Sequence, residues 1–339
     1  MSPYPLRTER LVLRIMQSAD LPVFVAYRND PELAKYQLWD LPYTEDAAAF
    51  VRDQDGWTDL QVGGWTQIAV ERDGTQIGDV CCHVDETGSL AQVGFTLTRE
   101  AWGHGYASEA ALALVTDLVD RIGVVRLMAE LDPANVASQR VLESIGLVHE
   151  SDAKRAYLWR GEWTDNMTYA ITADEWRAWR DRPTGPPAEV ELVEITAEDQ
   201  RGWRNLETHW SQRRLVSPVF VSYGDALFPP APDGERLRPV LRGILADGQR
   251  AGFVMYAEPT AAEPTPYLWR FLVDRRFQGR GIGARALQLL MDQWRSEGHQ
   301  SVLLSFGDGP GSPRGFYERL GAVPTGDMDE DEIVARITL

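Results

Sequence analysis

The sequence has 339 residues, of which 44% are hydrophobic and 25% charged, as in ordinary globular proteins, and this length favours two domains over one. Its net charge of -17 argues against nucleic acid and anionic membranes as partners, since both bind basic surfaces, and it favours a cationic small molecule. No apolar run could span a membrane and the start MSPYPLRTER lacks a signal-peptide core, so we expect a cytoplasmic protein. Two adjacent cysteines, Cys81 and Cys82, and five scattered histidines show no metal-ligand spacing, so no metal is expected.

The first half of the chain begins with a strand expected over residues 11–15, followed by a helical region. Asp73-Gly74 then lies between two strand-like runs, residues 65–70 and 76–84. An Asp-Gly pair flanked in this way is a strong signal for a β-hairpin.

A short glycine-containing stretch, residues 101–108 (AWGHGYAS), follows the next apolar strand and opens a long helix. The helix is predicted to face the core, because apolar residues recur at helical spacing along it: Ala111, Leu114, Val115, Leu118 and Val119. A further strand is expected over residues 125–131, and strand, helix, strand in this order favours a parallel pair.

Residues 181–189 (DRPTGPPAE) contain three prolines and a glycine, which cannot continue a helix and are typical of a linker. Beyond them the same landmarks recur in the same order. The offset is 174 residues for Asp247-Gly248, 176 for the glycine stretch 277–284 (FQGRGIGA), and 175 for the later Glu318, Gly321 and Val323. We therefore predict a tandem duplication of one fold, with domains at residues 1–180 and 190–339.

Each domain is predicted to be α/β, with a mixed, mostly antiparallel sheet covered by helices. The second domain is expected to start with a strand over residues 190–195 and to contain another over residues 302–306. Its long helix again has a core face, formed by Leu287, Leu290, Met291 and Trp294.

Both glycine stretches could bind a phosphate, because a helix start offers unpaired N–H groups and glycine allows close approach. The nucleotide motif GxxxxGK[ST] is absent, so an NTPase is not expected. Gly279-x-Gly281-x-x-Ala284 can be aligned with a dinucleotide fingerprint, but it follows antiparallel hairpins instead of the first strand of its domain.

The stretch Gln278-Gly279-Arg280-Gly281-Ile282-Gly283 resembles the acetyl-CoA loop of the GNAT N-acetyltransferases, Gln/Arg-x-x-Gly-x-Gly/Ala, at every position. The first copy, Trp102 to Ala107, differs by having Trp where the family has Gln or Arg. The resemblance covers nearly the whole chain and implies two GNAT domains that use acetyl-CoA. The residues it places against acetyl-CoA are Phe95, Leu97, Trp102, Gly103, His104, Gly105, Tyr106, Ala107, Ser108, Asn135, Leu272, Val273, Gln278, Gly279, Arg280, Gly281, Ile282, Gly283 and Ala284.

The two copies resemble different branches of that family. Residues 6–14 (LRTERLVLR) and 132–147 (DPANVASQRVLESIGL) are similar to the RimJ/RimL-type branch, which acylates N-terminal and small-molecule amines. Residues 217–228 and 316–339 look like the diamine/spermidine branch, whose substrates are cationic amines. The acidic run 327–332, with five acids in six residues, suits such a substrate, although a solvated acidic loop explains it equally well.

The chemistry of amine acetylation sets the other expectations. An alkyl amine must lose a proton before it attacks, so a carboxylate is needed nearby. Backbone N–H groups at the ends of the strands before the loops, Phe95 to Leu97 and Leu272 to Val273, could stabilise an oxyanion. The departing thiolate needs a proton, and the resemblance assigns this acid role to Tyr317.

In the first copy Leu142 stands in the place of Tyr317, and the resemblance points instead to Ser138, in the pattern Asn135-x-x-Ser138. Asn135 is also a sufficient helix N-cap. Relatives carry an acid where this chain has Ala156, so Glu130 and Asp132 are candidate replacements for the base.

The resulting hypothesis is an acetyl-CoA-dependent N-acetyltransferase that acts on a primary amine of a polyamine, an aminoacyl compound, an N-terminus or an amine antibiotic. It would work without nucleic acid or membrane, as a monomer or homodimer. Two alternatives stay open: only one domain is catalytic, or the chain is a non-catalytic acyl-CoA sensor.

Overall fold

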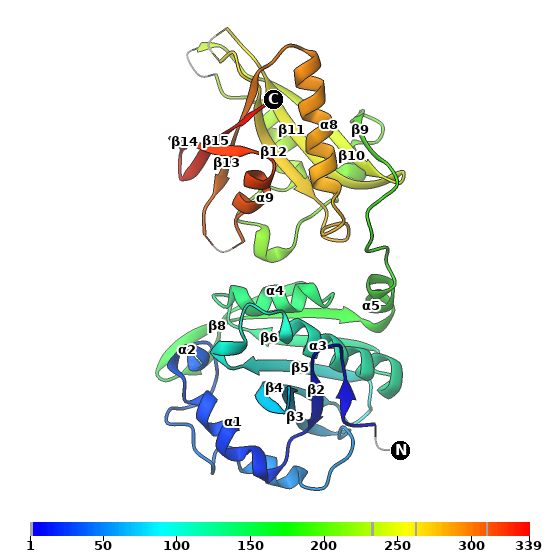
Figure 1. Cartoon of the computed structure of the whole chain (residues 1–339), viewed down its shortest axis with the longest axis vertical. Helices are drawn as coiled ribbons and strands as arrows, with labels where there is room; N and C mark the ends of the chain where they lie inside the picture. Colours follow the sequence, from blue (N-terminus) through cyan, green and yellow to red (C-terminus); the bar gives the residue numbers. More distant parts are fainter. Residues whose placement is uncertain (1–2, 232–233, 262, 310) are drawn as a thin grey trace. The chain divides into compact units, whose positions relative to one another are not determined.

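The computed structural model describes residues 3–231, 234–261, 263–309 and 311–339 (Figure 1). The chain divides into two compact units, Met1–Asp181 and Arg182–Leu339. The Pro-rich segment belongs to the second unit: the side chain of Arg280 donates to the carbonyl of Gly185 at 2.9 Å, and that of Arg285 donates to Pro187 at 2.7 Å. The end of this segment is therefore attached to the second unit and is not a free spacer.

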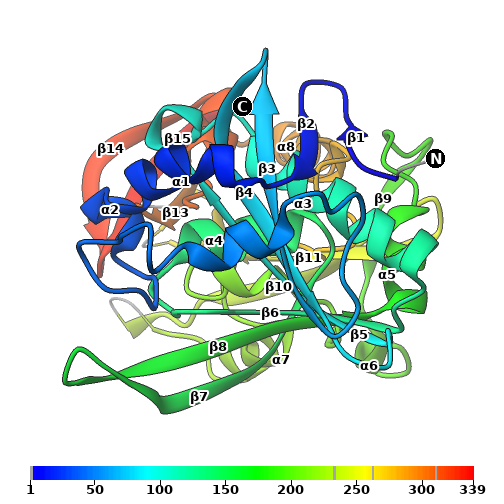
Figure 2. The same cartoon turned by 90° about the horizontal axis from the view of Figure 1, so that it is seen from below.

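The first unit contains an eight-stranded sheet in its described residues, in the order β1-β2-β3-β4-β5-β6-β8-β7. The last two strands form a long ribbon (Figure 2). The strands are β1 (Leu6–Arg7), β2 (Val12–Ile15), β3 (Gly64–Arg72), β4 (Thr75–Val84), β5 (Leu90–Leu97), β6 (Arg126–Leu131), β7 (Val148–Trp159) and β8 (Glu162–Thr172). The helices are α1 (Leu21–Arg28), α2 (Pro31–Ala34), α3 (Tyr106–Asp117), α4 (Val136–Ser144) and α5 (Ala173–Arg180).

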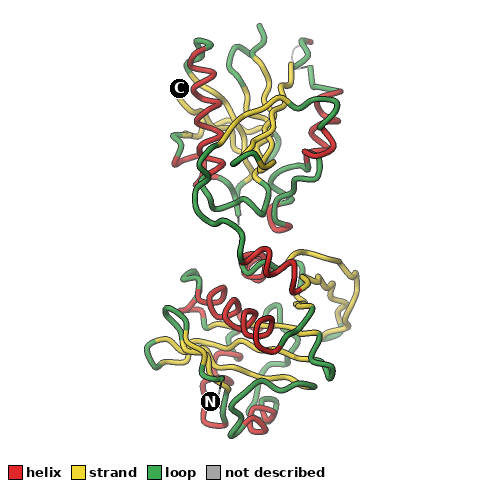
Figure 3. The backbone as a smooth tube through the Cα atoms, turned by 90° about the vertical axis from the view of Figure 1, so that its right-hand side faces the viewer, coloured by secondary structure: helices red, strands yellow, loops and turns green. Residues whose placement is uncertain are grey.

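The second unit repeats this order over its described residues with seven strands, β14-β15-β13-β12-β11-β10-β9. Helices cover both sides of its sheet (Figure 3). The strands are β9 (Val190–Glu194), β10 (Arg238–Ala246), β11 (Gln249–Glu258), β12 (Tyr267–Val273), β13 (Ser301–Gly307), β14 (Ala322–Asp329) and β15 (Glu332–Thr338). The helices are α6 (Gln200–Trp203), α7 (Val219–Leu227), α8 (Ile282–Ser296) and α9 (Arg314–Arg319).

The predicted fold is confirmed in both units. The Asp-Gly pairs form the turns of the hairpins β3-β4 and β10-β11, with positive φ at Asp73 and Asp247. The predicted apolar faces of α8 and of α3 with the π-helical turn Leu118–Ile122 that continues it are buried at every position. Along the described residues, no helix is both long enough and apolar enough to cross a membrane.

One parallel strand pair in each unit diverges along its length, and in the second unit the diverging strands line a cleft. In the second unit β12 and β13 pair only through Tyr267 with Leu303 and Leu268 with Leu304, and then diverge. In the first unit β5 and β6 pair from Leu90 to Gln92 and then separate. The ends of β5 and β12 therefore have a free edge where the following glycine loop begins.

Candidate active site

The two glycine loops have the same backbone conformation. The φ angles are +75° and +77° at Gly103 and Gly105, and +78° and +75° at Gly279 and Gly281. Gly105 and Gly281 are the N-caps of α3 and α8, so the first N–H groups of each helix face the loop. A Cβ added to Gly279 or Gly281 would meet no atom within 4 Å, so the space beside this loop is open to a ligand.

Trp102 takes over the structural role of the residue it replaces. In the second unit the side-chain Nε2 of Gln278 donates to the carbonyl of Val273 at the end of β12, at 3.0 Å. In the first unit Nε1 of Trp102 donates to the carbonyl of Leu97, at the end of β5, at 2.9 Å. The departure of Trp102 from the family pattern therefore leaves the loop attached to its strand.

We predict that Trp102→Gln keeps CoA binding by the first unit, because the amide restores the donor to Leu97. Trp102→Phe should weaken it about fivefold, the equivalent of losing one hydrogen bond of about 1 kcal/mol. Calorimetric titration with CoA of variants that also carry Gly281→Val, which removes the second site, measures this difference. Equal affinities for the two variants would contradict it.

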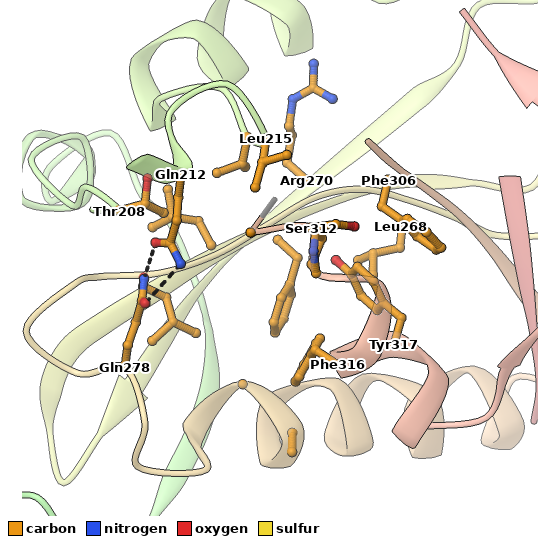
Figure 4. Close-up of a pocket in the computed structure, with 18 of the residues that line it drawn as sticks. Thr208, Gln212, Leu215, Leu268, Arg270, Gln278, Phe306, Ser312, Phe316 and Tyr317 are labelled. Atoms are coloured by element: carbon orange, nitrogen blue, oxygen red, sulfur yellow. Dashed lines mark hydrogen bonds between the residues drawn. The ribbon is translucent and has the colours of Figure 1, made fainter. Parts of the chain in front are cut away.

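Gln278 also connects the loop to the segment that precedes α7. Its amide exchanges two hydrogen bonds with the amide of Gln212, at 2.9 and 3.2 Å (Figure 4). Trp102 has no acceptor atom and cannot form such a pair. Sequence reasoning did not identify Gln212, because nothing in the sequence indicates which loop lies against Gln278.

A cavity of about 710 Å³ lies in the second unit, between its glycine loop and the diverging strands. It is lined by most of the predicted CoA-binding residues of that unit, namely Leu272, Val273, Gln278, Gly279, Gly281, Ile282, Gly283 and Ala284. Arg280 differs: its side chain is buried against the carbonyl of Gly185 and lies 3.7 Å from Asp247. Arg280 can therefore offer the ligand its backbone N–H but holds the Pro-rich segment with its side chain.

Tyr317, the predicted proton donor, lines the cavity of the second unit. It is carried by α9 and stacks on Phe306 with ring centroids 5.8 Å apart (Figure 4). Burial, reinforced by the charge of Glu332, raises the pKa of Tyr317 above its ordinary value. Its hydroxyl therefore stays protonated at neutral pH, as a proton donor must.

A carboxylate faces the cavity from the other side of the sheet. Ser305 alternates along β13 with core residues Leu304 and Phe306, so its side chain lies on the opposite face from Tyr317, and its hydroxyl donates to Glu332 on β15. The hydroxyl of Tyr267 lies 2.8 Å from Ser305 Oγ and 3.0 Å from a carboxylate oxygen of Asp329. Glu332 and Ser305 both line the cavity. The sequence indicated Glu332 only as one member of the acidic run 327–332, and it did not indicate Ser305.

The acidic run 327–332 is therefore divided by its hairpin. Asp329 and Glu332 lie at the β14-β15 ends that join this network. Glu330 and Asp331 lie in the turn between the strands and are exposed to solvent, and Asp327 is exposed on β14. Only part of the run can contribute charge to the cavity at short range.

The first unit has a corresponding carboxylate at Glu130. This residue is on β6, beyond the last pair with β5. Its carboxylate accepts hydrogen bonds from Asn166 at 3.1 Å and from Tyr157 and Gln92 at 3.4 Å. Although β8 lies between β6 and β7, the side chain of Tyr157, the residue after Ala156 on β7, reaches the Glu130 carboxylate.

Glu130 and Glu332 lie on opposite members of the equivalent strand pair in the two units. In the first unit the acid is on β6 and its amide partner, Asn166, is on β8. In the second unit the hydroxyl partner, Ser305, is on the equivalent strand β13, and the acid, Glu332, is on β15. Each unit therefore has one carboxylate hydrogen-bonded across the same strand pair, beside a tyrosine hydroxyl.

The structure places Ser138 one turn before Leu142 on α4, and the backbone N–H of Ser138 donates to the Asn135 side chain at 3.1 Å. Asn135 is thus the N-cap of α4, and Leu142 is fully buried in the core. The first unit accordingly has no tyrosine at the position of Tyr317.

The side chains of the first glycine loop are partly used for packing. Tyr106 is buried and stacks on His104, and Ser108 exchanges a hydroxyl hydrogen bond with Ser144. Arg10 donates to the carbonyl of His104 at 3.0 Å, stacks on Tyr106 and pairs with Glu109. The remaining predicted residues are Phe95 and Leu97 at the end of β5, Gly103 in the loop and Ala107 in the first turn of α3, where their backbone groups can contact a ligand. Arg10 is a cation beside the loop that sequence spacing could not reveal.

Family models match both units. The model described as "Acetyltransferase (GNAT) domain" matches residues 10–148, and "Acetyltransferase (GNAT) family" matches residues 203–322, together more than half of the chain. The chain belongs to the GNAT family. It is an N-acetyltransferase with two GNAT domains in tandem, as the two loops and the repeated sheet predicted.

Curated relatives agree with this assignment. The chain is 30% identical over 151 residues to the N-acetyltransferase p20 of Bacillus licheniformis, covering 43% of this chain and 83% of p20. It is 27% identical over 169 residues to the N-acetyltransferase YnaD of Bacillus subtilis, covering 50% of this chain and 97% of YnaD. It is 26% identical over 167 residues to the FsC-acetyl coenzyme A-N(2)-transacetylase of Aspergillus fumigatus, covering 43% of this chain and 67% of that enzyme.

Among solved structures, the GNAT acetyltransferase of Bacillus anthracis aligns with 25% identity and a TM-score of 0.44, covering 50% of this chain and 98% of that one. Enzymes of the GNAT family use acetyl-CoA. The open glycine loop, the helix N-terminus and the adjoining cavity of the second unit fit a pyrophosphate and a pantetheine arm.

Proposed function

We propose that the second GNAT domain transfers an acetyl group from acetyl-CoA to the primary amine of a small acceptor. The cavity carries this proposal, because one continuous space joins the glycine loop, the free end of β12, Tyr317 and Glu332. The name of the Aspergillus fumigatus relative, which gives acetyl coenzyme A as donor and N(2) as acceptor atom, supports the same reaction class.

In the second unit the proposed base and the proposed acid lie on opposite faces of the sheet. N–H groups of Gly279 to Gly283 would hold the pyrophosphate, and the free edge at Leu272 and Val273 would stabilise the developing oxyanion. Glu332 would take the proton of the attacking amine, and Tyr317 would donate a proton to the sulfur as it leaves. The base and the acid line one cavity from opposite faces of the sheet, so they can serve the two reaction partners separately.

A second catalytic site in the first unit is favoured by Glu130, which is held by Asn166, Tyr157 and Gln92 at the end of the paired part of β5 and β6. We propose that Glu130 is the base there and that Ser138 replaces the tyrosine acid. The weaker acid makes this unit the slower of the two.

Gly281→Val should abolish CoA binding by the second unit and leave binding by the first. Valine is strained at a φ of +75°, and its side chain would fill the open space beside the loop. Calorimetric titration with CoA should give two equivalents for the unchanged chain and one for the variant. Together with a thiol-release assay against a panel of amines, this titration also separates an enzyme from a CoA-binding module.

Gly298→Val provides a matched control, because Gly298 directly follows the C-cap of α8 with a φ of +93°, also with no atom within 4 Å of an added Cβ. It imposes the same backbone strain far along the helix from the loop. If it abolished CoA binding as fully as Gly281→Val does, the loss would reflect strain and the assignment of the loop would be wrong.

A further inference from the structure

Arg270 lies on β12 at the point where the cleft opens. It follows Leu268, the last residue that pairs with β13, by two positions. The register of β12 against β11 shifts between these residues, and Arg270 lies opposite Met255, which packs with Val219 of α7. Arg270 therefore projects on the α7 face, which is also the face of Glu332.

The guanidinium of Arg270 is only partly paired. Its Nη1 donates to the carbonyl of Trp269 at 3.0 Å, and its Nη2 lies 3.5 Å from a carboxylate oxygen of Asp225 on α7. Its Nε is buried and has no hydrogen-bond partner within the described ranges. The side chain extends away from Phe316 and Tyr317 (Figure 4), and it lines the cavity.

The charges of the cavity wall as a whole also favour an anion. The cations among the described lining residues are Arg213, Arg214, Arg270 and Arg319, and the single acid is Glu332. A polyamine would place a second ammonium group among these arginines and pay an electrostatic penalty. An acceptor with a carboxylate would instead meet the planar donor fork of Arg270.

We propose that the acceptor of the second unit carries a carboxylate as well as its amine, and that Arg270 binds the carboxylate while Glu332 receives the amine. This inference rests on the proposed function of the second unit. The first unit has Gly94 three residues before Leu97, where the second has Arg270 three residues before Val273, so the cation is specific to the second unit. The two domains would thus acetylate acceptors of different charge.

The test compares acceptors of equal length that differ in charge. Glycine, β-alanine and 4-aminobutyrate are each assayed beside their amides, with 1,4-diaminobutane as the dicationic counterpart of 4-aminobutyrate. For at least one length, kcat/KM of the unchanged chain should be about tenfold higher for the acid than for its amide. Arg270→Gln should reduce this ratio to near one, and Asp225→Asn should increase it, because the internal competitor for Arg270 is removed.

A purely structural Arg270 gives a different result. If Arg270 only attaches α7 to the sheet, Arg270→Gln and Asp225→Asn would both lower activity on acid and amide equally. That outcome, or a preference for amides or for 1,4-diaminobutane in the unchanged chain, would overturn the proposal while leaving amine acetylation intact.

Failure of the proposed function itself would be seen as no acetylation of any amine. The carboxylate site is then tested by calorimetric titration of the CoA-saturated chain with N-acetyl-4-aminobutyrate, N-acetyl-β-alanine and N-acetylglycine. Binding of one of them that is lost in Arg270→Gln would support the site. Absence of binding by all three, or equal binding to both proteins, would refute it.

Discussion

Tyr317→Phe should lower kcat of the second unit about 100-fold and leave its affinity for CoA unchanged. A positioned general acid contributes roughly 10²–10⁴-fold, and phenylalanine keeps the stacking on Phe306 but has no proton to donate. Because burial raises the pKa of Tyr317, the unchanged enzyme should not lose activity through this residue as the pH rises from 7 to 9. Turnover by thiol release and CoA affinity by calorimetry measure the two effects separately.

Tyr256→Phe is the matched control for this experiment. Tyr256 is also a buried tyrosine of the second core, packed edge-on against Trp294, but its ring is outside the lining of the cavity. Loss of the Tyr256 hydroxyl should change kcat by no more than about twofold relative to the unchanged chain. If Tyr317→Phe were equally active, the proton donor of this unit would be another group.

Glu332→Gln should lower kcat/KM of the second unit by about 10²- to 10³-fold, as expected for loss of a general base. The amide keeps the size of the side chain and can still accept from Ser305, so the fold should be preserved. The residual rate should rise about tenfold per pH unit, because only the acceptor that is already deprotonated in solution reacts. A pH profile of kcat/KM between 6 and 9 measures this slope.

Asp331→Asn controls for the general acidity of the hairpin. Asp331 lies in the exposed turn next to Glu332, and its loss removes the same charge without touching the cavity. We expect no more than a twofold change. A drop as large as that of Glu332→Gln would show that the acidic run acts through its overall field and that Glu332 has no special role.

The strands, hairpins and core faces of both units could be predicted because they depend on local patterns. Alternation and turn residues identified the hairpins at Asp73-Gly74 and Asp247-Gly248, and helical spacing identified the buried faces of α3 and α8. The glycine loops were predictable for the same reason, since a positive φ at Gly105 or Gly281 is a property of a short segment.

Other parts of the site depend on which residues meet across the sheet. The sequence could not show which acids of the run 327–332 face the cavity. Glu332 reaches Ser305 only because of the register of β15 against β13. Trp102 departs from the family pattern, but its indole donates to the carbonyl of Leu97, which is equivalent to the carbonyl of Val273 that accepts from the Gln278 amide in the second unit. Glu130 and Glu332 lie on non-equivalent strands, β6 and β15. Aligning the sequences of the two units therefore does not place them at the same position.

The sequence by itself determined that this protein is a tandem of two GNAT folds with two glycine loops, and it predicted Tyr317 as a proton donor. Those features follow from spacing along the chain, which periodic burial and backbone conformation impose. Only the tertiary structure decided that Glu130 lies beyond the paired part of β5 and β6, and that Arg270 and Glu332 line one cavity of the second unit. Electrostatic interactions act through space over a few ångströms, and folding brings together side chains that lie tens of residues apart.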